Sequence, residues 1–434
     1  MRLAPDGSSY LTSSSRQAET SSKSLFSLDS YHVSEELGFI LPDPLEKLPL
    51  YYQPWMDIAL RVPELVHSQE LRTLINKMPL LSSQFLQKHK ELRLAHLALS
   101  TMAMGYVWQG GESDTIEILP KSLAVPFWEV SQRLGLPPIL THADAALANW
   151  KKKDPEGPFD MENLELLLSL PGGDSVQGFF LVTMLVELAA VPALRNIPVV
   201  ISGVRCADSE AVARALETIS QSLQDMTDTL KLMHDYKPFL KCVLIFIHAH
   251  MNRWKDNPSM PKGLVYEGVN TEPMEYSGGS AAQSSLLHCF DELLGIKHEE
   301  KSGAFLTRMR NYMPPAHKQL IQDISLQPSL KSFVQQQDNE PLNQAFQHCV
   351  AKLLALRNYH INVVSRFITV PAARARQLRD KNQTSEGEMI SRAPTALEER
   401  GTGGSGIMIF LKTVRDHTRD AFLPDTSKEK EHNS

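Results

Sequence analysis

Apolar side chains recur at spacings of three and four residues along several segments of the chain, which is typical of α-helices with one buried face. The clearest of these segments runs from Asn343 to Thr369. Its apolar positions share one stripe: Phe346, Cys349, Val350, Leu353, Leu356, Val363, Val364, Phe367 and Ile368. A helix with this length and pattern is expected in the core, so side chains on the stripe should point into the protein.

The same periodicity predicts further helices, and strand-like alternation is scarce. A short turn or strand is expected at Ile118–Pro126, where the helical pattern is interrupted. The fold class is therefore all-α, with helices packed around one or two cores. The other predicted helices are 91–107, 179–194, 209–234, 284–295 and 406–422.

Composition changes along the chain suggest how it is divided. Residues 1–27 are polar and serine-rich and are expected to form a disordered tail. A charged, proline-bearing loop after Trp150 suggests a boundary between a small helical domain, 28–170, and a larger one, 171–434. Within the larger domain, residues 374–406 are rich in Arg, Gln, Thr, Glu and Gly and are expected to be a mobile loop.

Charge and cysteine content exclude several classes of protein. The 434 residues carry a net charge of −6 without a basic stripe, which argues against nucleic-acid binding. The four cysteines form no CxxC pair, so reduced thiols and a cytoplasmic location are expected. No signal peptide is apparent, and charged residues interrupt the longest apolar runs, 178–194 and 239–251, so no membrane span is expected.

His360 is the candidate chemical group on the 343–369 helix. It lies on the apolar stripe, four residues before Val364, and Arg357 leans the same way one turn earlier. A buried imidazole either satisfies its nitrogens by hydrogen bonding, which is the commoner outcome, or gives one nitrogen to a metal. The second alternative fits a single axial ligand of haem iron, with the Arg357 cation paired with a haem propionate. No second histidine lies three or four residues after His360, and no Cys, Asp or Glu lies next to it on the stripe, so a zinc site is not expected.

Two small-residue loops are candidates for ligand contact. The stretch Gly401-Thr-Gly-Gly-Ser-Gly matches GxGxxG, but it follows a charged helical run rather than a strand, so a dinucleotide fold is not indicated. It suggests a flexible lid with Thr402 as a donor. The loop beginning at Ser277 runs into a helix, where its amides either bind an anion or simply cap the helix.

The remaining candidates are weaker. Phe179 and Phe180 open an apolar helix and serve either core packing or a substrate wall, with the Thr183 hydroxyl on their side. His142 is a lone loop histidine, which usually faces solvent. Tyr266, in Leu-Val-Tyr-Glu-Gly-Val, fits a short phosphorylation motif for SH2 domains. No GxSxG, HExxH or GxxxxGK[ST] motif occurs.

Several stretches taken together resemble the indoleamine 2,3-dioxygenase family, from about Ser30 to the last predicted helix. His142 and two short stretches are closer to one of the family's two paralogues than to the better-known one. The stretches that carry the resemblance are Leu147-Ala-Asn-Trp-Lys-Lys-Lys-Asp-Pro, Gly178-Phe-Phe-Leu-Val, Gly263-Leu-Val-Tyr-Glu-Gly, Gly278-Gly-Ser-Ala, Tyr312-Met-Pro-Pro-Ala-His, Leu356-Arg-Asn-Tyr-His and Gly401-Thr-Gly-Gly followed by Phe410-Leu-Lys-Thr-Val-Arg.

The resemblance implies an all-α protein with a small N-terminal domain and a large C-terminal domain that encloses haem b. It implies that His360 is the proximal iron ligand, and that Asp291 supports Arg357, which reaches a propionate. The other implied roles are the haem edge and substrate amine for Ser280 and Ala281, the distal wall for Phe179 and Phe180, the place of a family serine for Thr183, and the lid for Thr402, Gly403 and Gly404.

The implied reaction inserts both atoms of O₂ across the indole C2–C3 bond of L-tryptophan and gives N-formylkynurenine. The implied partners are tryptophan or related indoles, O₂ and an electron donor that reduces the iron. The resemblance further implies a cytoplasmic, monomeric enzyme of tryptophan catabolism in the kynurenine pathway, with a role in immunity. One alternative is a haem-binding signalling protein with little turnover that uses Tyr266, and another is a helical interaction protein without a cofactor.

Two departures from the family pattern bear on activity. Counting back from Trp254, the family's substrate-binding arginine and its phenylalanine would fall at His248 and Val243, and their roles are not carried over to these residues. Arg253 or a protonated His248 is a candidate to substitute for the arginine. Losing a bidentate arginine costs ~2–5 kcal/mol, so weak or absent tryptophan oxidation is expected. The second departure is His142, followed by Ala145 and Ala146, where the family lines the distal pocket with larger side chains. A histidine there is expected to change pocket polarity and slow the reaction.

Overall fold

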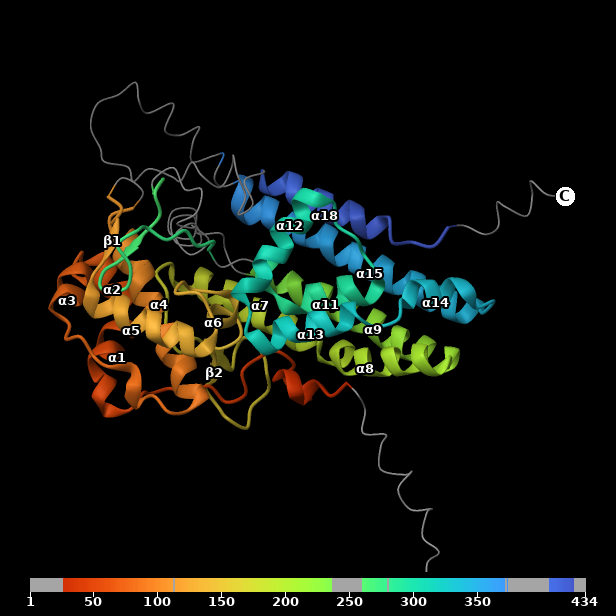
Figure 1. The fold of residues 1–434 in the computed structure, drawn as a ribbon, viewed down its shortest axis with the longest axis horizontal. Coiled ribbons are helices and arrows are strands. Elements are labelled where there is room, and N and C mark those ends of the chain that lie inside the picture. Colours follow the sequence, from red (N-terminus) through yellow and green to blue (C-terminus); the bar gives the residue numbers. More distant parts are fainter. Residues whose placement is uncertain are drawn as a thin grey trace, which may run out of the picture.

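The computed structural model describes residues 26–111, 114–235, 260–278, 281–370, 373 and 406–424. Within these ranges the chain is built from helices, which confirms the all-α prediction (Figure 1). Four two-residue strands form two small sheets in this part of the chain. Strand β1, Ile118–Leu119, pairs in parallel with β4, Val265–Tyr266. Strand β2, Lys151–Lys152, is antiparallel to β3, Leu164–Glu165.

The helices fall into two groups along the chain, and α1–α5 gather at one end of the molecule in Figure 1. The first group is α1 Gln53–Ala59, α2 Val62–His67, α3 Leu71–Lys77, α4 His89–Trp108, α5 Lys121–Leu134 and α6 His142–Ala145. The second is α7 Gly173–Ala189, α8 Val191–Cys206, α9 Ser209–Leu230, α11 Ser285–Leu294, α12 Glu300–Met309, α13 Pro315–Ser325, α14 Leu330–Gln336, α15 Glu340–Val364 and α18 Ile407–Arg419.

Short 3₁₀ turns and one π-turn complete the described secondary structure. The 3₁₀ turns are η1 Leu28–Tyr31, η2 Leu50–Tyr52, η3 Ser83–Phe85, η4 Lys231–Asp235, η5 Ala281–Gln283 and η6 Arg310–Tyr312. The stretch expected as a turn or strand at 118–126 divides into strand β1 and the start of α5. The predicted mobile loop at 374–406 falls outside the described residues except for Gly406.

Helix α15 is the predicted 343–369 helix, and it begins three residues earlier, at Glu340. The Asn339 side chain accepts a hydrogen bond of 3.0 Å from the Leu342 amide and so caps the first turn. Pro341 follows in that turn, where its missing amide hydrogen costs nothing. After Val364 the helix continues as the π-turn η7, Ser365–Thr369, a distortion that often occurs at functional sites.

Two large hydrophobic cores share the described chain, and neither is made from one continuous stretch. The N-terminal core joins α1–α5 with later residues such as Leu264 and Phe305. The C-terminal core joins α7–α9, α11 and α13–α15 with earlier residues such as Phe26 and Leu147. Phe26 is therefore packed, although it was assigned to the tail, whose residues 1–25 lie outside the described part. The predicted division at residue 170 stays a prediction, because segments cross between the cores.

A smaller apolar cluster lies where α7, α15 and α18 meet, and it is called the α7–α15 cluster below. Its buried members are Leu170, Val176, Val364 and Ile368. Phe179, Phe180, Ile407, Met408 and Leu411 pack against it, and Phe180 also contacts both large cores.

The stretch Gly173–Cys206, which spans α7 and α8, is long and apolar enough to cross a membrane by length and composition. In its most apolar window, 61% of the residues are buried inside the protein. The core packing of these helices accounts for that apolarity, since α7 and α8 both contribute side chains to the C-terminal core.

Candidate functional site

His360 lies on α15, one turn before Val364, and so faces the same side as that member of the α7–α15 cluster. Its ring nitrogens make no hydrogen bond with any residue in the described ranges. Burial, and then the positive charge of Arg357, lower the pKa of His360 to about 4. The ring is therefore neutral at neutral pH. A neutral imidazole on a rigid helix, with a nitrogen left available, is the form that binds iron.

Arg357 is buried three residues before His360 and is paired with Asp291 of α11. Its Nη2 donates to both Asp291 oxygens, at 2.6 and 2.8 Å, and its Nη1 donates to the Thr418 hydroxyl on α18. Burial raises the pKa of Asp291, but the charge of Arg357 and the hydrogen bond from His298 outweigh it and lower that pKa below its usual value. The structure links Asp291 to Arg357 as the resemblance implies, and contact with a propionate stays a prediction.

A single-ligand metal centre agrees with the rest of the described chain. No group of three or more His, Cys, Asp or Glu side chains that could hold a metal ion occurs in the described ranges. Any metal at His360 would then take its other ligands from a non-protein group such as a porphyrin.

The Phe179 and Phe180 rings stand edge to face on α7, with centroids 5.2 Å apart and an interplanar angle of 82°. Both pack against the α7–α15 cluster, which includes Val364 one turn from His360. Aromatic side chains that are partly buried beside a cluster are suited to form the wall of an apolar pocket. Their position agrees with a substrate wall, although core packing uses the same contacts.

Thr183 was expected to present a hydroxyl on the side of these two rings. Its Oγ1 instead donates to the Phe179 carbonyl of the same helix, at 2.7 Å. The hydroxyl hydrogen is thus used by the helix backbone, and only an oxygen lone pair stays available to accept from a ligand.

His142 lies on α6 and is buried, so the expectation of a solvent-facing loop histidine is wrong. Its Nε2 is 3.0 Å from Glu187 Oε1 of α7, and its backbone amide donates to Gln283 Oε1 at 3.0 Å. Glu187 Oε1 also accepts from the Ser284 hydroxyl at 2.6 Å. His142 therefore belongs to a buried polar cluster that ties α6 and the loop before α11 to α7. The sequence offered one signal of this cluster, the single charge of Glu187 within the apolar run of α7.

The loop before α11 does not cap the helix with a side chain. Ser284 occupies the N-cap position, but its hydroxyl donates to Glu187 rather than to a helix amide. A carboxylate of the chain itself thus lies at this end of α11, which leaves less reason to expect an anion there. Ala281 is half-buried in the short turn η5, Ala281–Gln283.

Several predicted site residues lie outside the described residues. These are Ser280, the lid residues Thr402, Gly403 and Gly404, and the 237–253 stretch with Val243, His248 and Arg253. Their predicted roles stay predictions.

Tyr266 is not placed for the signalling role considered from the sequence. The residue lies on β4 with none of its surface exposed, and its hydroxyl donates to the Pro138 carbonyl at 2.6 Å. A kinase or an SH2 domain needs an accessible hydroxyl in an extended segment, and this strand is packed into the N-terminal core. The correction follows from burial, which the six-residue motif does not report.

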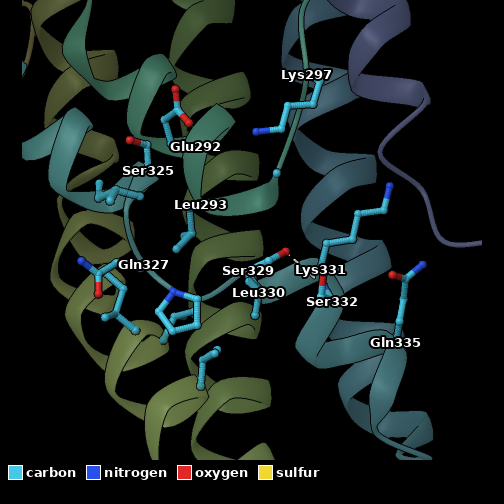
Figure 2. A pocket seen from close by; sticks show the side chains of 16 residues that line it. Glu292, Leu293, Lys297, Ser325, Gln327, Ser329, Leu330, Lys331, Ser332 and Gln335 are labelled. Atoms are coloured by element: carbon cyan, nitrogen blue, oxygen red, sulfur yellow. Dashed lines mark hydrogen bonds between the residues drawn. The ribbon is translucent and has the colours of Figure 1, made fainter.

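A surface hollow of about 180 Å³ lies between α8, α11 and α14, as Figure 2 shows. Glu292, Lys297 and Lys331 are among its lining residues. None of the predicted site residues lines it. Asp291 and His298, which adjoin Glu292 and Lys297 in sequence, do not line it. They bond to each other, and Asp291 also bonds to Arg357.

Residues 27–421 match the model of the protein family described as indoleamine 2,3-dioxygenase. The chain is 49% identical over 400 residues to indoleamine 2,3-dioxygenase 2 of Homo sapiens, covering 92% of this chain and 96% of that protein. It is 44% identical over 402 residues to indoleamine 2,3-dioxygenase 1 of Rattus norvegicus, covering 91% and 96%. It is also 36% identical over 397 residues to a protein named myoglobin from Haliotis madaka, covering 90% and 97%.

Proposed function

Because the chain belongs to the indoleamine 2,3-dioxygenase family, and is an oxidoreductase of the dioxygenase class, we propose that it converts L-tryptophan and O₂ to N-formylkynurenine with low efficiency. The observation that carries the proposal is the neutral imidazole of His360, which makes no hydrogen bond with the described residues and lies on the helix that also supplies Val364 to the α7–α15 cluster. Reduced thiols at Cys206, Cys289 and Cys349 support a cytoplasmic location.

The residues that are present fit haem b. His360 would hold the iron, since its ring is in the neutral form that coordination needs and makes no hydrogen bond within the described part of the chain, and Arg357 would lie near a propionate. Asp291 and Thr418 fix the Arg357 guanidinium from two sides, so that its charge would be held in place for a haem propionate. When bound and reduced by an electron donor, haem supplies the iron that activates O₂, and no protein acid–base pair is required.

The protein itself would then bind the indole substrate, orient it and exclude water from it. Phe179 and Phe180 present apolar ring surface against which an indole can lie flat or edge-on. The two rings and Met408 of α18 all pack against the cluster that includes Val364, and this packing would exclude water from that side of the site. Glu187 holds His142 and Ser284, and so fixes the two segments that flank α7.

Low efficiency is inferred from the sequence around Trp254. Counting back from Trp254, the position at which the resemblance implies a carboxylate-binding arginine falls at His248 in this chain. The missing bidentate contact corresponds to ~2–5 kcal/mol, which is at least about thirtyfold in affinity.

Comparing tryptophan with tryptamine tests the proposal, because tryptamine is the same indole without the carboxylate. With ferrous protein and a supplied reductant, we expect a Soret band that His360→Ala abolishes, and product that forms well only at millimolar tryptophan. The two substrates should then differ by less than about tenfold in kcat/KM. A preference of hundreds-fold for tryptophan, or rapid turnover at micromolar tryptophan, would contradict the inferred loss of carboxylate binding.

The second candidate function is haem binding with little or no turnover. It is favoured by the relative from Haliotis madaka, whose name is myoglobin rather than dioxygenase. The same assay separates the two functions, since this candidate requires the Soret band without product from either indole.

A further inference from the structure

The partly buried His298 and the buried His417, which are distant in sequence, meet beside Asp291. His298 follows α11, and His417 lies near the end of α18. Their Nδ1 atoms are 3.2 Å apart, and His298 Nε2 is 2.9 Å from Asp291 Oδ2. His417 Nε2 faces Glu299 Oε1 at 3.6 Å, and the Glu299 side chain is 79% exposed. A line of polar contacts thus runs from solvent to the Arg357–Asp291 pair.

The Nδ1–Nδ1 contact limits how many protons the two rings can hold. A hydrogen bond between these atoms needs one nitrogen with a hydrogen and one without. His298 donates its Nε2 hydrogen to the Asp291 carboxylate, so its Nδ1 accepts from His417 when His298 is neutral. The bond survives when one ring is charged. It is lost when both rings are imidazolium, because two donors and two positive charges then face each other across 5.4 Å between ring centroids.

The charges around His298 and His417 compensate one positively charged ring better than two. Asp291 is already neutralised by Arg357, and Glu299 is exposed and therefore screened. Burial lowers the pKa of the neighbouring His288 to about 4, so that ring is neutral at neutral pH. The titratable and charged groups around the pair are Asp291 and His288 on α11, Glu292 with Arg310, Glu299, Arg357 on α15, and Lys331, which reaches the end of α18.

Helix α18 joins this pair to the candidate site. Figure 1 shows α18 running alongside α15, and residues of the two helices are in contact. One end is anchored by His417 and by Thr418, which accepts from Arg357. At the other end Ile407, Met408 and Leu411 pack on the α7–α15 cluster beside Phe179 and Phe180.

We propose that the His298–His417 pair is a proton-sensitive anchor that docks α18 on α15 and thereby positions the apolar side chains of α18 over the α7–α15 cluster. The two histidines are positioning residues, since they act through Asp291, Arg357 and the helix. The inference goes beyond the proposed function, and its test needs no turnover.

Hydrogen–deuterium exchange of the full-length, haem-loaded protein tests the proposal. Protection of α18 peptides is compared with that of α13 peptides in the same sample, after correction for the intrinsic effect of pH on exchange. Between about pH 7.5 and about pH 5.5, where histidines gain their second ring proton, the α18 protection of the wild type should fall about tenfold relative to α13.

His417→Gln supplies the discriminating variant, because a glutamine amide can still donate to His298 Nδ1 but does not titrate. Its α18 protection should stay constant across the same pH range. His348→Gln is the matched control, since His348 is an exposed histidine on α15, and this variant should behave as the wild type.

A wild-type ratio that does not change with pH, or an equal fall in His417→Gln, would overturn the proposal. If His417→Gln does not fold, His298→Gln is measured in its place, and the wild-type ratio alone still contradicts the proposal when it stays flat.

Discussion

Separating Arg357 from Asp291 should destabilise the fold more than removing both. Asp291→Leu leaves the Arg357 guanidinium buried with the Thr418 hydroxyl as its remaining partner among the described residues, and arginine cannot lose its charge. We expect a loss of about 4–5 kcal/mol in the free energy of unfolding. Arg357→Met leaves a carboxylate that keeps the His298 bond and can take up a proton, so we expect the smaller loss of about 3 kcal/mol.

The double variant Asp291→Leu/Arg357→Met leaves no uncompensated charge, so its loss should fall short of the sum by at least about 2 kcal/mol. Urea unfolding followed by far-UV circular dichroism measures each value, with haem-free samples run in parallel to separate folding from haem binding. Single losses below about 1 kcal/mol, or a double loss equal to the sum, would refute the reasoning.

The dependence on pH gives a second check on the same pair. The pKa of Asp291 is lowered in the folded state, so its contribution is complete above the unfolded value of about 4 and is lost as pH falls through the folded value. The part of the difference between the wild type and Asp291→Leu that comes from the Asp291 charge should therefore be lost as pH falls below about pH 4.

Two further substitutions follow from other buried contacts. His142→Tyr keeps a donor toward Glu187 but removes an imidazole from the predicted pocket floor, and should raise kcat roughly two- to tenfold, the scale of one hydrogen bond; an unchanged kcat would show that the ring does not act on the pocket. Asp144→Asn removes the carboxylate that holds His96, 2.9 Å away, and should cost about 3–5 kcal/mol at neutral pH. Burial raises the pKa of Asp144, but the charge and hydrogen bond of His96 lower it below its usual value. The difference in unfolding free energy between the wild type and Asp144→Asn should therefore narrow below about pH 4 in urea titrations. A difference that does not depend on pH would contradict the pairing of Asp144 with His96.

Local periodicity predicted those features of the structure that depend on one helix face. The apolar stripe of α15 was readable because residues three and four apart share a face, and the same pattern placed His360 and Arg357 on the inner side. The resemblance to the family then predicted that Asp291 supports Arg357, and the structure has that contact.

The partners of these side chains were not readable from the sequence. His142 meets Glu187 across 45 residues, and His298 meets His417 across 119. Periodicity predicts which face of a helix is buried, but it does not predict which other segment of the chain packs against that face. The exposure of Tyr266 was misjudged for the same reason, because its short motif contains no information on the packing of β4.

The exchange of segments between the two large cores has a consequence for biosynthesis. The Tyr266 hydroxyl bonds to Pro138, 128 residues earlier, and Phe305 is packed among helices that end before residue 140. The N-terminal core therefore cannot be completed until more than half of the chain has been synthesised. Until then the early helices expose apolar surface that chaperones can bind. A transcript or protease product that stops near residue 250 would not be a small stable version of this protein, because it would lack the residues that fill the first core.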